Sequence, residues 1–136
     1  MTMECSLLYV SRATLAAERL DAAADDIVAL SRAYNASAGI TGGLVLAGGY
    51  FAQLLEGPTE AVKTLMERIN RDPRHEEVSV LRIAARSKRQ FPDWSMAYAG
   101  GSTYVAKQIA ALLGPGPADP KQIDRLTTLI VSFASM

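Results

Sequence analysis

The stretch GITGGLVLAGGYFAQLLEG, residues 39–57, decides the fold. Two apolar runs are divided by Ala47-Gly48-Gly49, and because glycine readily adopts the positive φ of tight turns, this spacing predicts a β-hairpin. Side chains alternate along a strand, so Gln53 shares a face with Phe51 and Leu55. A buried amide without partners costs about 1–3 kcal/mol. The sequence therefore predicts a polar partner for Gln53, which is another side chain, an ordered water or a ligand.

The composition is that of one soluble globular domain. The chain has 136 residues, of which 49% are hydrophobic, and its 14 basic and 14 acidic residues cancel without forming a block of like charge. This balance argues against nucleic acid as a partner. A single cysteine and a single histidine exclude an internal disulfide and a Cys/His zinc site. No apolar run is long enough to cross a membrane and no signal-like start is present, so we expect a cytoplasmic protein without a membrane partner.

The remaining patterns predict an α+β fold of the ferredoxin-like type. Strands are expected at 5–11, at both arms of the hairpin, at 77–85 and at 91–98, and helices at 21–34 and from 59 to the proline at 73. The order β-α-β-β-α-β, with an added strand, gives one sheet with two helices on one face.

Two additional helices are expected at the C-terminal end of the chain, at 104–113 and from Pro120 onward, with Asp119 as the N-cap of the second. The last helix carries an apolar stripe of Ile123, Leu126, Ile130 and Phe133. The open face of the sheet, a second copy of the chain or a partner could cover this stripe, and packing on its own domain is the default.

Polar residues are predicted to gather on the side of the sheet that faces the first two helices. The first and third strands are adjacent in this topology, so Tyr9 and Gln53 can lie there together. Asn35, at the end of the first helix, would join them. The three side chains would enclose a cleft between helices and sheet.

These residues lie in motifs that together resemble the BLUF family, blue-light sensors that use flavin. The motifs are Tyr9 in LLYVS, Asn35 in SRAYNASAGITG, Gln53 in FAQLLEGP, DPRH at 72–75 and FPDWSMAY at 91–98. The resemblance implies a photoreceptor rather than an enzyme, with FAD, or alternatively FMN or riboflavin, held non-covalently between the two helices. It also implies a flavin-binding photosensory domain at 1–99 and a C-terminal helical extension at 100–136 that acts as a cap, an oligomerisation element or an output element.

The resemblance assigns roles to single residues. It implies cofactor contacts by Tyr9, Ser31, Asn35, Gln53, Arg68 and Asp72. Tyr9 would give an electron and then a proton to the light-excited flavin, and their return would leave the amide of Gln53 rotated or tautomerised, with a stronger hydrogen bond to a flavin carbonyl. Trp94 and Met96 would carry the signal from the fifth strand to the C-terminal helices.

Structural alternatives exist for several of these residues. Arg68 and Asp72, at i and i+4, could be a helix-surface ion pair. Ser31 could bond its own helix backbone, Trp94 and Met96 could be packing residues, and His75 could be a local cap or hydrogen-bonding residue.

Two other functions fit the same fold. One is a small acylphosphatase-like hydrolase that uses Arg12 and Asn35, although this would leave Gln53 without a role. The other is a cofactor-free interaction module. Under the photoreceptor interpretation, the segment after Tyr98 is too short for an output enzyme, so we expect a self-associating protein that signals to a separate effector.

Overall fold

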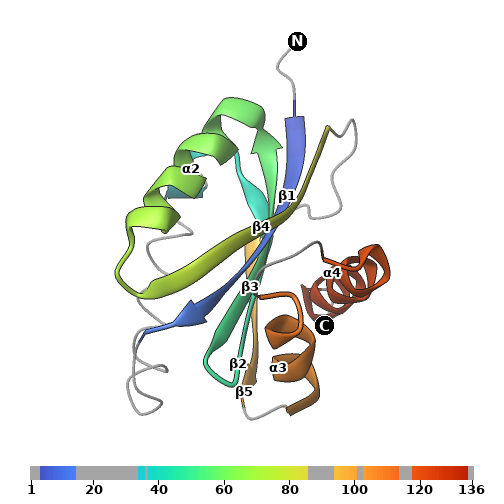
Figure 1. Cartoon of the computed structure of the whole chain (residues 1–136). Helices are drawn as coiled ribbons and strands as arrows, with labels where there is room; N and C mark the ends of the chain where they lie inside the picture. The colour runs from blue at the N-terminus through green and yellow to red at the C-terminus, as the bar shows by residue number, and fades with distance from the viewer. Residues whose placement is uncertain are drawn as a thin grey trace.

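A five-stranded sheet separates two layers of helices (Figure 1). The computed structural model describes residues 4–14, 34–35, 37–85, 94–100, 103–113 and 118–134. The strands are β1 (Glu4–Ala13), β2 (Thr41–Ala47), β3 (Tyr50–Pro58), β4 (His75–Ala85) and β5 (Trp94–Gly100), and the helices are α2 (Thr59–Arg71), α3 (Thr103–Ala110) and α4 (Pro120–Ala134). The strand order is β4-β1-β3-β2-β5, with β5 parallel to β2 and the other pairs antiparallel. The predicted ferredoxin-like α+β fold with C-terminal helices is confirmed.

The hairpin predicted from the sequence connects β2 and β3. Ala47 faces Tyr50 across a two-residue turn formed by Gly48 and Gly49, whose φ angles are 56° and 85°. Positive φ at both central residues is the geometry that glycine permits and that follows the natural twist of a hairpin. β3 then lies in the middle of the sheet, between β1 and β2.

Helix α2 covers one face of the sheet. Val62 and Met66 are its buried residues, and they pack in one cluster with residues of β1 and β3 such as Leu7 and Leu55. Tyr9 belongs to the same cluster. The side of the sheet that carries Tyr9 is therefore the side covered by α2.

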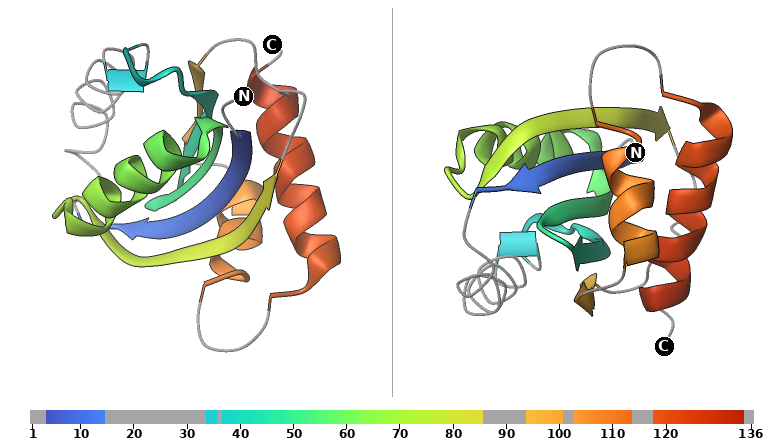
Figure 2. Two further views of the ribbon diagram at one scale, coloured as in Figure 1. Left: turned by 90° about the horizontal axis from the view of Figure 1, so that it is seen from above. Right: turned by 60° about the horizontal axis from the view of Figure 1, so that its bottom comes forward.

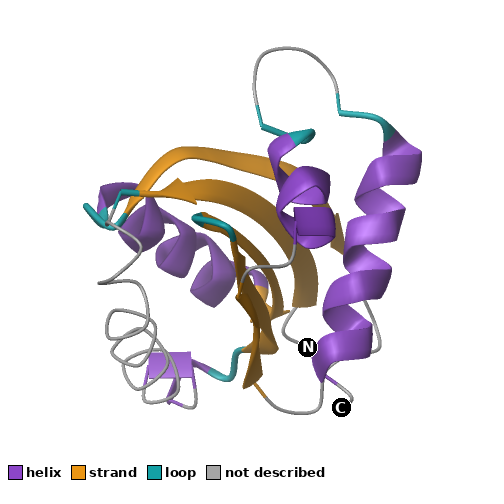
Figure 3. Cartoon of the chain, turned by 90° about the horizontal axis from the view of Figure 1, so that it is seen from below, coloured by secondary structure: helices purple, strands orange, loops and turns teal. Residues whose placement is uncertain are grey.

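Helices α3 and α4 cover the opposite face, as seen from above in Figure 2 and from below in Figure 3. Ile123, Leu126 and Ile130 of α4 are buried in a cluster with sheet residues such as Leu8 and Leu54. The apolar stripe of the last helix thus packs on its own sheet, which was the default prediction. The side chain of Phe133 lies outside the described residues.

The start of α4 also follows the prediction. Its first helical residue is Pro120, and the backbone N–H of Lys121 donates to Oδ1 of Asp119 at 2.9 Å. Asp119 is therefore the N-cap, where its side chain satisfies a backbone donor that no helix carbonyl can reach. None of the helices in the described ranges combines the length and the apolar character that crossing a membrane requires.

The fourth strand begins earlier than predicted, at His75 rather than Glu77. Glu77 adopts a φ of 52°, and the pairing of β1 with β4 shifts register near this point. Such an irregularity lets the strand continue while one residue leaves the regular ladder. His75 consequently lies in the sheet, opposite Ala13.

Most of the first predicted helix, with Ser31, lies outside the described residues. Residues 34–35 and 37–38, at and just after its predicted end, are helical.

Candidate functional site

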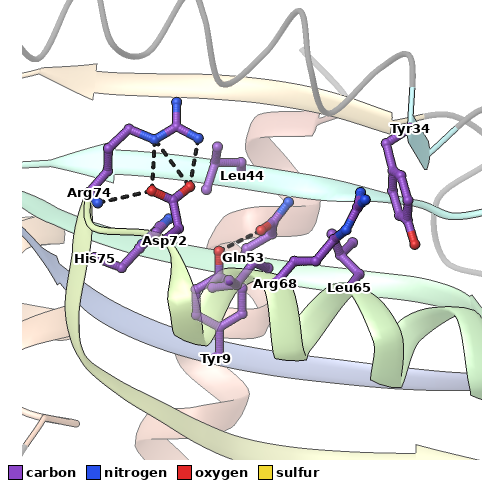
Figure 4. A pocket seen from close by; sticks show the side chains of 10 residues that line it. Tyr9, Tyr34, Leu44, Gln53, Leu65, Arg68, Asp72, Arg74 and His75 are labelled. Atoms are coloured by element: carbon purple, nitrogen blue, oxygen red, sulfur yellow. Dashed lines mark hydrogen bonds and ion pairs between the residues drawn. The ribbon is translucent and has the colours of Figure 1, made fainter.

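The two residues singled out in the sequence form a direct pair. Tyr9 on β1 faces Gln53 on β3 in the antiparallel register, and its hydroxyl donates to Oε1 of Gln53 at 2.6 Å. Their exposed fractions are 1% and 4%. The polar partner expected for Gln53 is thus a tyrosine hydroxyl, and Figure 4 shows the amide nitrogen of Gln53 turned away from Tyr9.

This pair belongs to one row of facing residues that crosses the whole sheet. Val80 of β4 faces Tyr9, Gln53 faces Leu44 of β2, and Leu44 faces Met96 of β5. Trp94 lies two residues before Met96 on β5, opposite Gly42. The side chains of Trp94 and Met96 lie outside the described residues, so their predicted signalling role stays a prediction.

A cavity opens over this row, between the sheet and α2 (Figure 4). It holds about 670 Å³ of space between protein atoms, part of it open to solvent. The described residues that line it are Tyr9, Tyr34, Leu44, Gln53, Leu65, Arg68, Ile69, Asp72, Arg74 and His75.

One wall of the cavity carries an ion pair just after α2 ends. Arg74 Nη2 lies 2.6 Å from Oδ2 of Asp72, and its Nε donates to both carboxylate oxygens at 3.0 and 3.1 Å. Burial works to raise the pKa of Asp72, but the hydrogen bonds and the charge of Arg74 outweigh it and hold that pKa below its usual value. Arg68 lies instead over the ring of Tyr34, 4.6 Å from its centroid. Asp72 therefore pairs with Arg74, and the i, i+4 surface pair with Arg68 is not the arrangement observed.

Burial has the largest effect on the pKa values of Tyr9 and His75. It raises the pKa of the Tyr9 phenol, and the negative charge of Asp72 adds to this shift. Burial also lowers the pKa of His75 to about 4, against the opposing charge of Asp72 and with the help of Arg74. Both groups are therefore neutral near pH 7.

The structure brings together four of the predicted site residues: Tyr9, Gln53, Arg68 and Asp72 all line the cavity. Asn35 is buried, with 1% of its surface exposed, but it is not among the described lining residues; its backbone carbonyl accepts from the N–H of Ile40 at 2.9 Å. Ser31 lies outside the described residues.

Several lining residues were not assigned to the site from the sequence. Leu44 could have been found, because the register of the hairpin places it opposite Gln53. Arg74 and His75 lie in the quoted DPRH motif, but their places depend on the turn after α2 and on the irregularity at Glu77.

The lining chemistry fits a flavin. A flavin ring is a flat apolar body with hydrogen-bonding atoms along one edge, and here Leu44, Leu65 and Ile69 supply apolar walls while Gln53 supplies an amide. The guanidinium groups of Arg68 and Arg74 suit its polar, anionic chain. Within the described ranges no group of three or more His, Cys, Asp or Glu side chains is placed to hold a metal ion.

Comparisons with known proteins agree with this geometry. The family model described as BLUF, sensors of blue-light using FAD, matches residues 5–97. The chain is 40% identical over 132 residues to the photoactivated adenylate cyclase subunit beta of Euglena gracilis, a match that covers 96% of this chain but 14% of that protein.

Two solved proteins match over most of their length. The dark-state structure of BlrB, a BLUF protein, is 33% identical with a TM-score of 0.78, covering 97% of this chain and 98% of BlrB. The ground state of BlsA is 27% identical with a TM-score of 0.76, covering 95% of this chain and 88% of BlsA.

Proposed function

The chain belongs to the BLUF family of flavin-binding blue-light sensors, and on that premise we propose that it binds FAD in the cavity above Tyr9 and Gln53 and switches the hydrogen bonds of Gln53 in light. The observation that carries this proposal is the 2.6 Å hydrogen bond from the Tyr9 hydroxyl to Gln53 at the cavity wall. FAD is preferred to FMN or riboflavin because it is the cofactor in the description of the family.

The chemistry that a bound flavin supplies is a strong one-electron oxidant under blue light. Tyr9 can give up an electron, and its hydroxyl proton can leave along the existing hydrogen bond to Gln53. Both would then return to Tyr9, and their return would leave the amide of Gln53 rotated or tautomerised. Gln53 is suited to the switch because an amide carries an acceptor and two donors on one rotatable group.

The proposed cofactor contacts are Tyr9, Ser31, Asn35, Gln53, Arg68 and Asp72. The cavity lining supports four of them. For Asn35, its complete burial at the end of a helical segment supports the assignment. Ser31 rests on the family resemblance alone.

We further propose that residues 1–99 form the photosensory part and residues 100–136 the output part, with Trp94 and Met96 on the route between them. The packing of α3 and α4 on the sheet face behind Gln53 supports this route, because a change in the sheet would reach both helices. The recipient of the signal in this proposal is a separate effector protein. Self-association and a cytoplasmic location stay predictions, and the stripe of α4 no longer supports self-association because the sheet covers it.

The hydrolase alternative is not favoured. Arg12, its candidate anion-binding residue, pairs with Glu77 at 3.3 Å and lies over the ring of Tyr50, and it is not among the described residues that line the cavity.

The test is the visible spectrum of the protein supplied with FAD, in darkness and just after blue light. We expect a flavin band that moves slightly to the red and recovers in the dark. Tyr9→Phe should keep the flavin and lose the shift, whereas Tyr104→Phe, which alters an exposed tyrosine of α3, should keep both. A full shift in Tyr9→Phe would refute the assigned donor, and a colourless protein would favour a cofactor-free module. Chromatography of the released cofactor separates FAD from FMN and riboflavin.

A further inference from the structure

His75 lies beside Tyr9 but has no role in the proposed switch. Its ring is edge-on to the ring of Tyr9, with centroids 6.2 Å apart, and tilted against the ring of Phe51 at 4.5 Å. It also lines the same cavity. The imidazole thus fills the space between two central strands and the cavity.

A hydrogen bond fixes this ring. Nδ1 of His75 lies 2.8 Å from Oγ of Ser11, a serine of β1 with no exposed surface. The serine hydroxyl can donate to Nδ1 or accept from it, so this bond holds the ring in place with either neutral tautomer.

The surroundings of the ring favour the uncharged form. Two charged groups in the turn after α2 act on His75. The carboxylate of Asp72 favours a proton on the imidazole and the guanidinium of Arg74 disfavours it. Their effects oppose each other, and the two groups form an ion pair. β1 presents the neutral Tyr9 and Ser11, and β3 presents the ring of Phe51. Burial therefore has the largest effect on the charge of His75, and it disfavours the protonated imidazolium.

We propose that His75 is a positioning residue for Tyr9, with Ser11 anchoring the neutral imidazole against the ring of the tyrosine. This proposal rests on the function of Tyr9 as the electron donor. A positive charge about 6 Å from Tyr9 would oppose the loss of an electron from its ring, so a neutral His75 keeps Tyr9 oxidisable. His75 itself takes up neither the electron nor the proton, since both return to Tyr9.

The first experiment needs no flavin. His75 is the only histidine of the chain, so ¹⁵N signals from histidine-labelled protein without an affinity tag belong to it. We expect the ring-nitrogen signals of a neutral imidazole, which should change little from pH 8 to pH 5. Ser11→Ala should move the signal of Nδ1, because that nitrogen loses its hydrogen-bond partner. A titration midpoint near pH 6.5 in the unaltered protein would overturn the proposal.

The second experiment measures how fast bound flavin fluorescence is quenched by Tyr9. His75→Gln is neutral and should stay within about twofold of the unaltered protein, whereas the permanent charge of His75→Arg should slow quenching by about tenfold or more. Equal quenching in both variants would refute the link to Tyr9. If the arginine variant does not fold, quenching in the unaltered protein is compared at pH 7 and pH 4. Slower quenching at pH 4, where His75 takes up a proton, supports the link to Tyr9, and equal quenching refutes it.

The experiments distinguish a failure of the proposed light response from a failure of the proposed role of His75. No light-induced shift in the unaltered protein would refute the proposed function, and the nitrogen signals would still report on the neutral ring. A normal shift together with an ordinary histidine titration would refute only the role of His75.

Discussion

The hydroxyl of Tyr9 donates a 2.6 Å hydrogen bond to Oε1 of Gln53, and the two residues face each other across the central strands β1 and β3. Each is a hydrogen-bond partner for a buried polar group of the other. Their bond therefore serves the stability of the dark protein as well as the proposed switch.

Removing either partner should cost stability. Tyr9→Phe leaves the acceptor of Gln53 without its donor, and Gln53→Leu leaves the tyrosine hydroxyl buried without an acceptor; each should lower the free energy of unfolding by about 1–3 kcal/mol. The double variant should lose clearly less than the sum, because no polar group is then left unpaired. Urea unfolding of the four proteins without cofactor measures this cycle. Strictly additive losses would show that the bond contributes nothing to the coupling of the two sites.

Two glycines of the hairpin should respond differently to alanine. A Cβ at Gly42 would lie 1.9 Å from the backbone carbonyl oxygen of Leu54, which can move only if β2 and β3 separate. Gly42→Ala should therefore cost more than about 4 kcal/mol, which is exceptional for one substitution. Gly49, with a φ of 85°, has nothing within 4 Å of the added atom. Gly49→Ala should cost only about 1–2 kcal/mol of left-handed backbone strain. Thermal unfolding of both variants checks the prediction, and similar losses would mean that the close approach at Gly42 relaxes.

The centre of the site was predictable because two independent rules place its residues. Strand alternation puts Gln53 and Tyr9 each on a defined face, and the ferredoxin-like order makes their strands neighbours. The glycine turn then fixes the register of β2 against β3. Neither step depends on side-chain detail, which is why both hold in the structure.

The rim of the cavity was harder to predict because it depends on where α2 ends. Arg68 and Asp72 have helical spacing, but the helix ends at Arg71, and Asp72 has an extended backbone with ψ of 120°. Asp72 therefore turns to Arg74. The position of His75 depends in turn on a left-handed Glu77, and glutamate gives no sequence signal for that conformation.

Stability should fall in mild acid because of His75. Its pKa is about 4 in the folded chain and about 6.5 in the unfolded chain. The unfolded state therefore binds more protons between these values, and the free energy of unfolding should fall by about 2–3 kcal/mol from pH 7 to pH 4.5. Asp72, whose pKa is lowered, contributes stability that is lost only at still lower pH, as it takes up a proton. Urea unfolding at the two pH values measures the loss, and His75→Gln should remove most of it. If His75→Gln lost as much unfolding free energy between pH 7 and pH 4.5 as the unaltered protein, the loss would come from groups other than His75.

The last prediction concerns the hydrogen bonds between β4 and α4. Val80 faces Tyr9 and Arg82 faces Leu8, so Leu81 is an extra residue in the ladder, and both Leu81 and Arg82 contact the α4 layer. Arg82 donates from Nη1 to Asp124 at 2.8 Å and from Nη2 to Thr127 at 2.9 Å. These two bonds join α4 to the strand next to Tyr9.

Arg82→Gln should therefore loosen α4 without unfolding the sheet. The ion pair is 41% and 68% exposed at its two side chains, so its loss should cost less than about 1 kcal/mol and raise amide hydrogen exchange in α4 by up to about fivefold. Arg12→Gln is the matched control, since it breaks a pair between β1 and Glu77 of β4 with 45% and 50% exposure that does not involve α4. Exchange in α4 should stay unchanged in this control. If both variants raised exchange in α4 equally, the effect would come from a general weakening of β4. The hydrogen bonds of Arg82 would then not stabilise α4 specifically.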